Sequence, residues 1–473
     1  MNLEKNRIPD TVKHIHLIAV CGSAMGAMAC MLKDMGFKIT GSDHAVYPPM
    51  SDFLLSKGIE IADGFHKKNM AHDPDLVIVG NAVTKENPEA KEMFRKGLHF
   101  CSMPQAVNHF FAKDKKTFLL TGTHGKTTIS SVLAWIFHKA GLDPSFMIGG
   151  ILKDFNSNYR LGKGDVIVIE GDEYDTAFFD KGPKFLHYPP EMAVLTSIEF
   201  DHADIFRDLD HVKDAFHAFI SGISRDSTLF AYDNDENISE LICDAPCRVA
   251  RYGRNPNSPW QLDQVAVRPP WMTFSVLKSG KPFAEFRTRM VGEHNLLNIL
   301  SAIAIADGVG ISTGAIAGAL ETFQGIRRRQ DVRGQKRGIT VMDDFAHHPT
   351  AVRETVRAVK PFYPDGCLIA VFEPRTNSSM RKVFQEVYPH SFDAADMVCI
   401  RKPSRLDKVP EAERFSSEKL VADLEKLGKD AHHFPDTESV MEFLVETASP
   451  GDVVLIMSNG GFDNIHERLL EKL

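Results

Sequence analysis

Residues 117–128 of this 473-residue chain combine the groups that bind a polyphosphate. An apolar run at 118–120 is typical of a buried strand, and the glycines after it let backbone N–H groups approach phosphate oxygens. Lys126 adds a positive charge, and Thr127 offers a hydroxyl to Mg²⁺. The segment predicts a nucleotide site made of Gly122, Thr123, His124, Gly125, Lys126, Thr127 and Thr128. Leu120 stands where the general pattern has its first glycine, so the loop is a shortened variant; a plain strand-to-helix turn is the alternative.

Two later apolar runs also end in groups suited to a metal ion. Glu170 closes the run 165–170, and His202 follows the run 193–198. Parallel strands present their carboxyl ends to a ligand crevice, so both side chains are expected beside phosphates held at Lys126. A Mg²⁺ site of Thr127, Glu170 and His202 is predicted, with Lys126, Glu170 and His202 as the catalytic residues. Two solvated strand ends are the alternative.

The first segment predicts a Rossmann-like unit. A strand at 15–20 leads into a glycine turn and a helix, and a second strand at 38–41 ends at Asp43. A glycine turn at a helix N-terminus, with an acidic residue about 20 positions on, is suited to a diphosphate and a ribose hydroxyl. Gly22 and Gly26 form this turn, and Asp43 is the acidic residue. A structural turn without a ligand is the alternative.

The third segment predicts a second ligand face. Strands expected at 340–342, 367–372, 397–400 and 453–457 each end in a polar cluster. Among these clusters, Arg375 is best suited to grip an acidic substrate, because a guanidinium can hold a carboxylate with two hydrogen bonds. A structural ion pair is the alternative. Between the segments, 271–276 and 283–289 predict a hairpin, and Asn295 and Asn298 share one face of a following helix.

Composition limits the class of protein. The hydrophobic fraction of 43% and charged fraction of 25% are ordinary for a globular protein, and a net charge of −8 favours neither nucleic acid nor a membrane surface. The seven cysteines form no metal-binding pattern, and no apolar run is long enough to span a membrane. We expect a cytoplasmic α/β protein with small-molecule substrates, a monomer or weak homo-oligomer. Its three predicted domains are 1–114 (Rossmann-like), 115–325 (central P-loop domain) and 326–473 (Rossmann-like).

A series of motifs along the whole chain resembles the Mur ligase family. The series comprises the segment 122–128, Glu170, Asp201 with His202, the Gly-x-His-Asn-x-x-Asn segment 292–298, the arginines 327–329 and the Asp-Asp-Phe-Ala-His-His-Pro segment 343–349. Each motif alone is weak, but their order and spacing together are specific. Segments 372–377 and 457–462 are more similar to the family branch that recycles a murein tripeptide than to the branch that adds alanine.

The resemblance implies an ATP- and Mg²⁺-dependent amide ligase of peptidoglycan metabolism. UDP-N-acetylmuramate would bind the first domain, with Gly22, Ser23 and Gly26 as substrate-binding residues at its diphosphate and Asp43 near its uridine. ATP would bind the second domain and L-alanyl-γ-D-glutamyl-meso-diaminopimelate the third, and the reaction would pass through an acyl phosphate. It also implies nucleotide contacts at Asn295, Arg327 and Asp344, and acceptor contacts at Arg375, Asn377 and Asn459. The alternatives are a UDP-N-acetylmuramate–L-alanine ligase, a dinucleotide-dependent oxidoreductase and a nucleotide-gated binding protein.

Two positions depart from the family pattern. Several branches carry a carbamylated lysine where this chain has His217, so no carbamate is expected. Glu170 and His202 are 32 residues apart, which is longer than expected for the alanine-adding branch. We place the additional residues at about 181–190.

Overall fold

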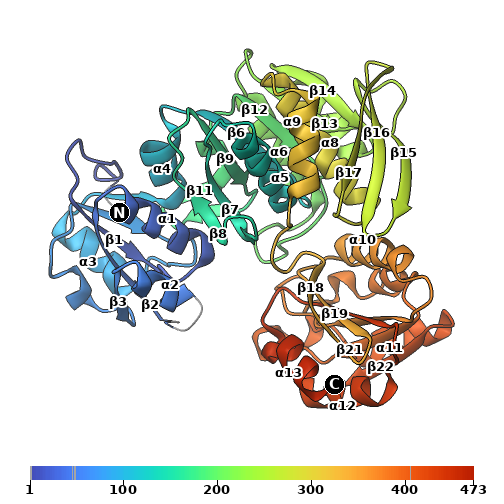
Figure 1. The fold of residues 1–473 in the computed structure, drawn as a ribbon. Coiled ribbons are helices and arrows are strands. Elements are labelled where there is room, and N and C mark those ends of the chain that lie inside the picture. The colour runs from blue at the N-terminus through green and yellow to red at the C-terminus, as the bar shows by residue number, and fades with distance from the viewer. Residues whose placement is uncertain (1–2, 45, 47–49, 405) are drawn as a thin grey trace.

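The computed structural model describes residues 3–44, 46, 50–404 and 406–473. The chain forms three α/β domains, each built around its own main sheet, with the central domain contacting the other two (Figure 1). This architecture confirms the predicted fold class. The predicted strands at 118–120 and 453–457 lie in β6 and β23, and the polar clusters that follow them lie at sheet edges.

The N-terminal sheet has the parallel strand order β3-β2-β1-β4-β5. The first strand ends two residues before the predicted Val20, because Ala19 takes a φ of 67° and the chain turns away there. The elements are β1 (His14–Ile18), α1 (Ser23–Asp34), β2 (Lys38–Asp43), α2 (Met50–Ser56), β3 (Glu60–Asp63), β4 (Leu76–Val79), α3 (Pro88–Lys96), β5 (Phe100–Ser102) and α4 (Met103–Val107).

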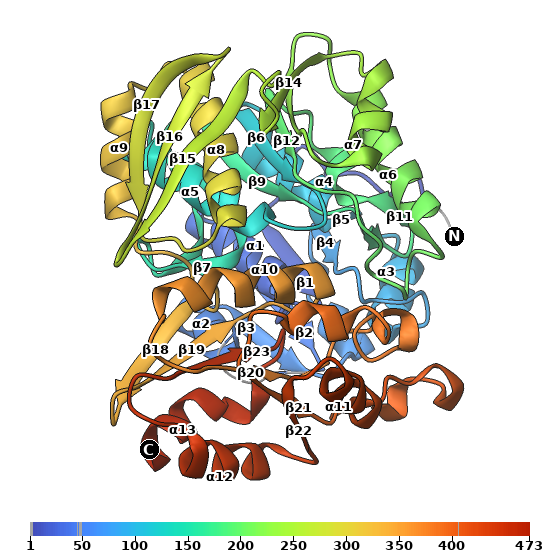
Figure 2. The same cartoon turned by 90° about the vertical axis from the view of Figure 1, so that its right-hand side faces the viewer.

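The central sheet has ten strands in the order β17-β16-β15-β14-β13-β12-β6-β9-β7-β8. Helices α5, α8 and α9 cover one side of it, and α6 and α7 lie on the other (Figure 2). The elements are β6 (Lys116–Thr121), α5 (Lys126–Lys139), β7 (Ser145–Leu152), β8 (Ser157–Arg160), β9 (Val166–Gly171), β10 (Asp175–Ala177), β11 (Asp180–Pro183), β12 (Met192–Leu195), α6 (Leu209–Gly222), β13 (Thr228–Tyr232), α7 (Glu236–Leu241), β14 (Arg248–Gly253), β15 (Trp260–Arg268), β16 (Trp271–Lys278), β17 (Lys281–Thr288), α8 (Glu293–Gly308) and α9 (Thr313–Thr322).

Three details of the central domain refine the sequence expectations. The hairpin is present as β16 and β17, and Ser279 and Gly280 turn it with positive φ. Sequence patterns missed its third strand, β15. Strand β12 ends at Leu195 and not at 198, because Thr196 bonds back to the carbonyls of Thr121 and His124.

The C-terminal sheet has the order β18-β19-β23-β20-β21-β22, with β18 antiparallel to the rest. Its elements are β18 (Asp331–Lys336), β19 (Ile339–Asp344), α10 (Pro349–Val359), β20 (Leu368–Phe372), β21 (Met397–Arg401), α11 (Ser417–Lys426), β22 (Asp430–Phe434), α12 (Thr437–Thr447), β23 (Val453–Met457) and α13 (Ile465–Lys472). Helix α10 faces the central domain (Figures 1 and 2).

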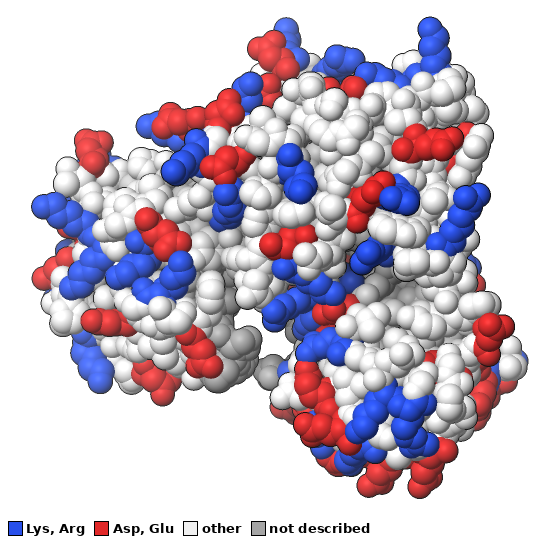
Figure 3. Space-filling model, in the orientation of Figure 1, with Lys and Arg blue, Asp and Glu red and all other residues white. Residues whose placement is uncertain are grey.

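Burial of apolar side chains differs between the domains. One continuous cluster joins the N-terminal domain to the central domain and includes Ile15, Met28, Leu119 and Phe216. The two clusters of the C-terminal sheet consist of residues of that domain alone. On the face shown in Figure 3, acidic and basic side chains are interspersed. Within the described residues, none of the helices has both the length and the apolar character needed to cross a bilayer.

Candidate active site

The loop between β6 and α5 has the geometry of a phosphate cradle. Gly122 and Gly125 have φ of 118° and 81°, a region that favours glycine. A Cβ on Gly122 would lie 2.1 Å from Thr196 Oγ1, and one on Gly125 would lie 2.4 Å from Asn298 Oδ1, so neither position has room for a side chain. Helix α5 begins at Lys126 without a side-chain cap. Its first N–H groups are therefore available to an anion.

Lys126 lies at the centre of a charged cluster. Its Nζ donates to the carbonyl of Gly122 at 2.6 Å and to Glu173 Oε2 at 2.8 Å. Burial alone would lower the pKa of Lys126, but the charges of Glu173 and Asp172 outweigh it and raise the pKa. Lys126 therefore keeps its positive charge at neutral pH. The same ion pair outweighs the effect of burial on Glu173 and lowers the pKa of that carboxyl.

Glu170 faces the hydroxyl of Thr127. Thr127 Oγ1 donates to Glu170 Oε2 at 3.1 Å, and the amide of Gly149 donates to Glu170 Oε1 at 2.7 Å. Burial, followed by the charge of Asp172, raises the pKa of Glu170. A cation beside this carboxylate would offset both effects. The predicted pair of oxygen ligands is thus brought together.

His202 is fixed beside the same cluster but contacts a different carboxylate. Its Nε2 lies 3.3 Å from Glu173 Oε1, and its ring packs against Tyr174 at 5.0 Å between centroids. Burial alone would lower the pKa of His202, but the hydrogen bond to Glu173 and the charge of Asp201 outweigh it and raise the pKa. Its φ of 52° is uncommon for a non-glycine residue. Glu173 therefore links Lys126 to His202.

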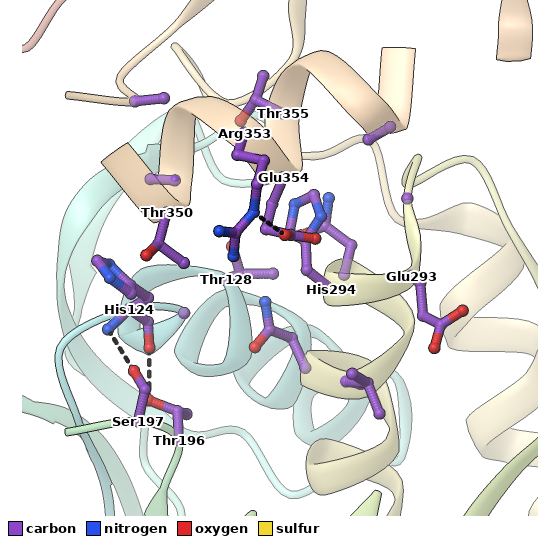
Figure 4. Close-up of a pocket in the computed structure, with 18 of the residues that line it drawn as sticks. His124, Thr128, Thr196, Ser197, Glu293, His294, Thr350, Arg353, Glu354 and Thr355 are labelled. Atoms are coloured by element: carbon purple, nitrogen blue, oxygen red, sulfur yellow. Dashed lines mark hydrogen bonds and ion pairs between the residues drawn. The ribbon is translucent and has the colours of Figure 1, made fainter. Parts of the chain in front are cut away.

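A cavity of about 820 Å³ extends from the phosphate loop to helices α8 and α10 (Figure 4). Its lining is polar near Lys126 and includes the apolar side chains of Val265 in β15, Met272 in β16 and Met290 just after β17. The labelled side chains of His124 and Thr128 come from the loop and α5, and those of Thr350 and Arg353 come from α10. A polar end beside an apolar one suits a nucleotide.

Two of the three predicted nucleotide contacts outside the loop line this cavity. Asn295 is buried and donates to the carbonyl of Val291 at 2.7 Å. Asp344 is buried and accepts from the amides of Gln330 and Ala346, each at 2.7 Å. Arg327 is exposed and donates to Asn156 Oδ1 at 2.7 Å.

Arg329, two residues after Arg327, lines the cavity. Burial, only partly offset by the charge of Asp344, lowers the pKa of Arg329. The arginine run therefore sends its third member into the cavity, while its first lies on the surface.

The C-terminal domain contacts the loop that carries His202. Ser378 Oγ donates to Asp201 Oδ1 at 2.9 Å and accepts from the amide of Ala203 at 3.1 Å. Asn377, predicted to bind the acceptor, donates its Nδ2 to Asp204 Oδ2 at 2.9 Å. The segment that follows β20 is thereby held against the strand end at β12.

Arg375 and Asn459 lie on the polar edge of the C-terminal sheet. Arg375 is one-quarter exposed, and its Nη1 is 3.7 Å from Glu373 Oε2. Glu373 is fully buried and is also paired with Arg401 and with Ser458 Oγ. The Oδ1 atom of Asn459 is buried and has no hydrogen-bond partner.

Gly460 lies directly beneath the guanidinium of Arg375. A Cβ on Gly460 would meet Arg375 Nε at 2.3 Å, so the arginine fits because residue 460 has no side chain. The carbonyls of Ser458 and Gly460 each accept from Arg328 Nη2 at 2.6 Å. These bonds hold the 458–460 turn in position beneath Arg375.

The N-terminal glycine turn lies at the interface with the central domain. Gly22 precedes the first residue of α1, and Gly26 is buried within that helix. Helix α1 has no side-chain cap, and the carbonyl of Ser23 accepts from Asn158 Nδ2 at 3.4 Å. Asp43 Oδ2 accepts from the amide of Cys21 at 2.8 Å, so the carboxylate and the turn are adjacent.

Sequence reasoning gave little weight to three groups of this site. Glu173 lies within a polar run after β9, where Glu170, at the strand end, was the more obvious carboxylate. Glu199 and His348 come from separate domains, yet Glu199 Oε2 is 3.6 Å from His348 Nδ1. The only sequence signal for the latter pair was the position of each residue beside a motif.

Sequence and fold comparisons extend over the whole chain. The Mur ligase family catalytic domain matches residues 14–115, the Mur ligase middle domain matches 120–306, and the Mur ligase glutamate ligase domain matches 328–460. The chain is 37% identical over 460 residues to the UDP-N-acetylmuramate–L-alanyl-γ-D-glutamyl-meso-2,6-diaminoheptandioate ligase of Escherichia coli, covering 97% of this chain and 98% of that protein. It is 33% identical over 464 residues to a UDP-N-acetylmuramate–L-alanine ligase of Clostridium botulinum, covering 97% and 98%.

Solved structures give the same grouping. A murein peptide ligase of Psychrobacter arcticus aligns with a TM-score of 0.72 at 32% identity, covering 97% of this chain and 98% of that one. A UDP-N-acetylmuramate–alanine ligase of Thermotoga maritima aligns with a TM-score of 0.80 at 24% identity, covering 98% and 99%. The latter likeness concerns the fold alone.

Proposed function

The chain belongs to the Mur ligase family, and we propose that it joins UDP-N-acetylmuramate to the preformed tripeptide L-alanyl-γ-D-glutamyl-meso-diaminopimelate at the expense of ATP. The observation that carries the proposal is the contact between the segment holding Arg375 and the loop holding His202. The contact supports an acceptor site beside the phosphate loop. The substrates imply a cytoplasmic enzyme, and a monomer contains every residue that the proposal uses.

The reaction has two steps that these residues can support. The carboxylate of the muramoyl group attacks the γ-phosphorus of ATP, giving an acyl phosphate and ADP. The α-amine of the tripeptide then attacks the acyl carbon, phosphate leaves, the nitrogen loses a proton and the amide bond forms. Lys126 and the uncapped N-terminus of α5 stabilise charge on the transferring phosphoryl group. Asn295, Asp344 and Arg329 contact the nucleotide across the cavity.

The oxygen atoms of Thr127 and Glu170 fit a Mg²⁺ site. Adjacent ligands around an octahedral Mg²⁺ with bonds of about 2.0–2.1 Å are about 2.9 Å apart. The observed separation of Thr127 Oγ1 and Glu170 Oε2 is 3.1 Å. When bound there, Mg²⁺ would neutralise charge on the phosphate groups. Glu173 holds Lys126 and His202 through one carboxylate oxygen each.

The C-terminal edge fits an acceptor that carries several carboxylates. Arg375 is positioned for a fork-shaped contact, and the amide group of Asn459 has a buried oxygen without a partner. A tripeptide with a diaminopimelate residue supplies both carboxylates and an ammonium group to such an edge. Free alanine has one carboxylate and would leave most of these groups unpaired.

An acceptor comparison tests the proposal. Purified enzyme with ATP, Mg²⁺ and UDP-N-acetylmuramate is offered tripeptide or alanine, and product is identified by mass. Tripeptide ligation with little alanine ligation is expected. Arg375→Ala should weaken tripeptide binding by about 2–5 kcal/mol if the guanidinium grips a buried carboxylate, while ATP binding is retained. Ligation of alanine alone would favour the second candidate, an alanine ligase, which the relative at 33% identity supports.

A further inference from the structure

Three potential metal ligands converge where the central and C-terminal domains meet. His124 belongs to the phosphate loop, Glu199 follows β12, and His348 immediately precedes α10. Glu199 Oε2 lies 3.5 Å from His124 Nε2 and 3.6 Å from His348 Nδ1. One ligand atom from each residue lies within 4.8 Å of the other two. Neither Thr127 nor Glu170 belongs to this group.

The orientation of His348 fixes which of its ring nitrogens can bind a cation. Its Nε2 is 3.2 Å from the carbonyl of Phe200, and its Nδ1 accepts from the amide of Thr350 at 3.3 Å. Both contacts require the proton on Nε2, so Nδ1, which is 3.6 Å from Glu199 Oε2, carries the lone pair. A ligating histidine commonly donates its second N–H to a carbonyl in this way. The bond from Thr350 is long, and a cation would replace it.

The other two residues are also held for binding. The Nε2 atom of His124 is buried without a hydrogen-bond partner. The backbone of His124 is fixed by Ser197 Oγ, which accepts from its amide at 3.1 Å, and by Thr196 Oγ1, which donates to its carbonyl at 2.5 Å; both bonds are drawn in Figure 4. Thr350 Oγ1 orients the carboxylate by donating to Glu199 Oε2 at 2.6 Å.

These distances match the ligand shell of a tetrahedral metal ion. With metal–nitrogen and metal–oxygen bonds of about 2.0–2.1 Å, neighbouring ligand atoms are about 3.3–3.4 Å apart. The distances from Glu199 Oε2 to the two imidazole nitrogens are within a few tenths of an ångström of that length. A small rotation of the imidazoles would bring the two nitrogens to the same distance from each other. We propose that His124, Glu199 and His348 bind one zinc-class divalent cation, with a fourth position open to water or a phosphate oxygen.

The ligand chemistry separates this site from the Mg²⁺ position. Two imidazoles and one carboxylate suit Zn²⁺, Co²⁺ or Ni²⁺, whereas Mg²⁺ prefers oxygen ligands. Because the ligands come from two domains, the cation binds their closed arrangement more tightly than any arrangement that separates His348 from His124. Binding therefore stabilises the closed arrangement. This site is independent of the acceptor's identity.

Zinc binding to the metal-free full-length protein tests the proposal without substrates. Titration calorimetry with Zn²⁺ should show one site, and Co²⁺ as a probe should give the visible absorption of a tetrahedral complex. Zn²⁺ should also raise the midpoint of thermal unfolding. His348→Ala and His124→Gln should each weaken Zn²⁺ affinity at least tenfold and remove the Co²⁺ band. Circular dichroism verifies that both variants are folded.

Two matched histidines serve as controls. His347→Ala removes an imidazole whose Nδ1 contacts the carbonyl of Phe345. Although His347 is next to His348 in the chain, this change should leave Zn²⁺ affinity unchanged. His202→Ala removes the imidazole beside Glu173 and should also leave it unchanged. No stoichiometric binding to the wild type would overturn the proposal. So would loss of binding in His202→Ala with retention in folded His348→Ala and His124→Gln.

Discussion

The central domain meets its two neighbours through contacts of opposite character. Toward the N-terminal domain the contact is largely apolar: the aromatic rings of Phe94 and Phe100 pack edge-on against Phe178 and Phe179, in addition to the shared hydrophobic cluster. Toward the C-terminal domain the described contacts beside the phosphate loop are mainly polar or charged, such as Ser378 with Asp201, although Phe362 also packs against the apolar core of the central domain. The apolar contact excludes water over a continuous core.

This difference indicates which domain can move. Separating the apolar interface exposes buried surface to water, with a cost that grows with area. Hydrogen bonds and ion pairs such as Thr350–Glu199 and Lys153–Asp331 can be exchanged for bonds to water at little net cost. We infer that the N-terminal and central domains form the stable unit, and that the C-terminal domain opens and closes over the nucleotide.

Lys126→Ala should give the largest effect and separate the two interfaces functionally. Loss of the charge at the transferring phosphoryl group should lower kcat on the order of 10³-fold. Calorimetry should show nearly unchanged affinity for UDP-N-acetylmuramate, because that ligand is assigned to the N-terminal side. A large loss of sugar affinity in this variant would contradict the division of ligands between domains.

His348→Asn should change how stability depends on pH at the polar interface. Burial, followed by the charge of protonated His124, lowers the pKa of His348 to about 4. As pH falls, His348 binds a proton in the unfolded chain before it does so in the folded chain. The contribution of this histidine to the free energy of unfolding is therefore complete above about pH 6.5 and is lost as pH falls toward 4. The whole pH-dependent change in the free energy of unfolding from this histidine is on the order of 3 kcal/mol.

Asn keeps a cap on α10 but does not titrate. In EDTA, the midpoint of thermal unfolding should therefore fall less steeply between pH 7 and 4.5 in His348→Asn than in the wild type. Parallel curves for the two proteins would rule out this histidine as the source of the slope.

Phe179→Ala should weaken the apolar interface. Its ring lies 4.8 Å from that of Phe100, between centroids, and it is half-buried. Removing it should cost about 2 kcal/mol of stability, less than a fully buried phenylalanine. Urea unfolding followed by domain-specific tryptic cleavage is the measurement. If the N-terminal domain were released no faster than in the wild type, the rings would not hold the two domains together.

Ser378→Ala should have the smallest effect on stability and a clear effect on turnover. It removes the hydroxyl that joins Asp201 to the amide of Ala203. We expect a loss of about 1 kcal/mol or less in unfolding, because water can replace the contact. The rate of ligation should fall by a larger factor than the affinity for ATP. The KM for the acceptor should rise as well. A stability loss equal to that of Phe179→Ala would remove the contrast between the interfaces.

Local sequence patterns were sufficient for much of the fold. The phosphate loop, the hairpin of β16 and β17, and strand β23 follow from glycine positions and apolar runs, since these patterns act within a few residues. The missed strand β15 and the early end of β12 depend on pairing and on side-chain bonds from distant segments. The motif series predicted an ATP-dependent amide ligase. The relatives named as ligases exclude the alternative of an oxidoreductase.

The sequence by itself predicted the phosphate loop, Glu170 and His202 as groups of the site, but not Glu173, Glu199 or His348. Tertiary structure alone decided their partners: Glu173 between Lys126 and His202, Arg329 in the cavity where Arg327 was expected, and Gly460 beneath Arg375. It also decided that His124, Glu199 and His348 meet. The physical reason is that these contacts join residues far apart in the chain, and their geometry depends on how whole domains pack.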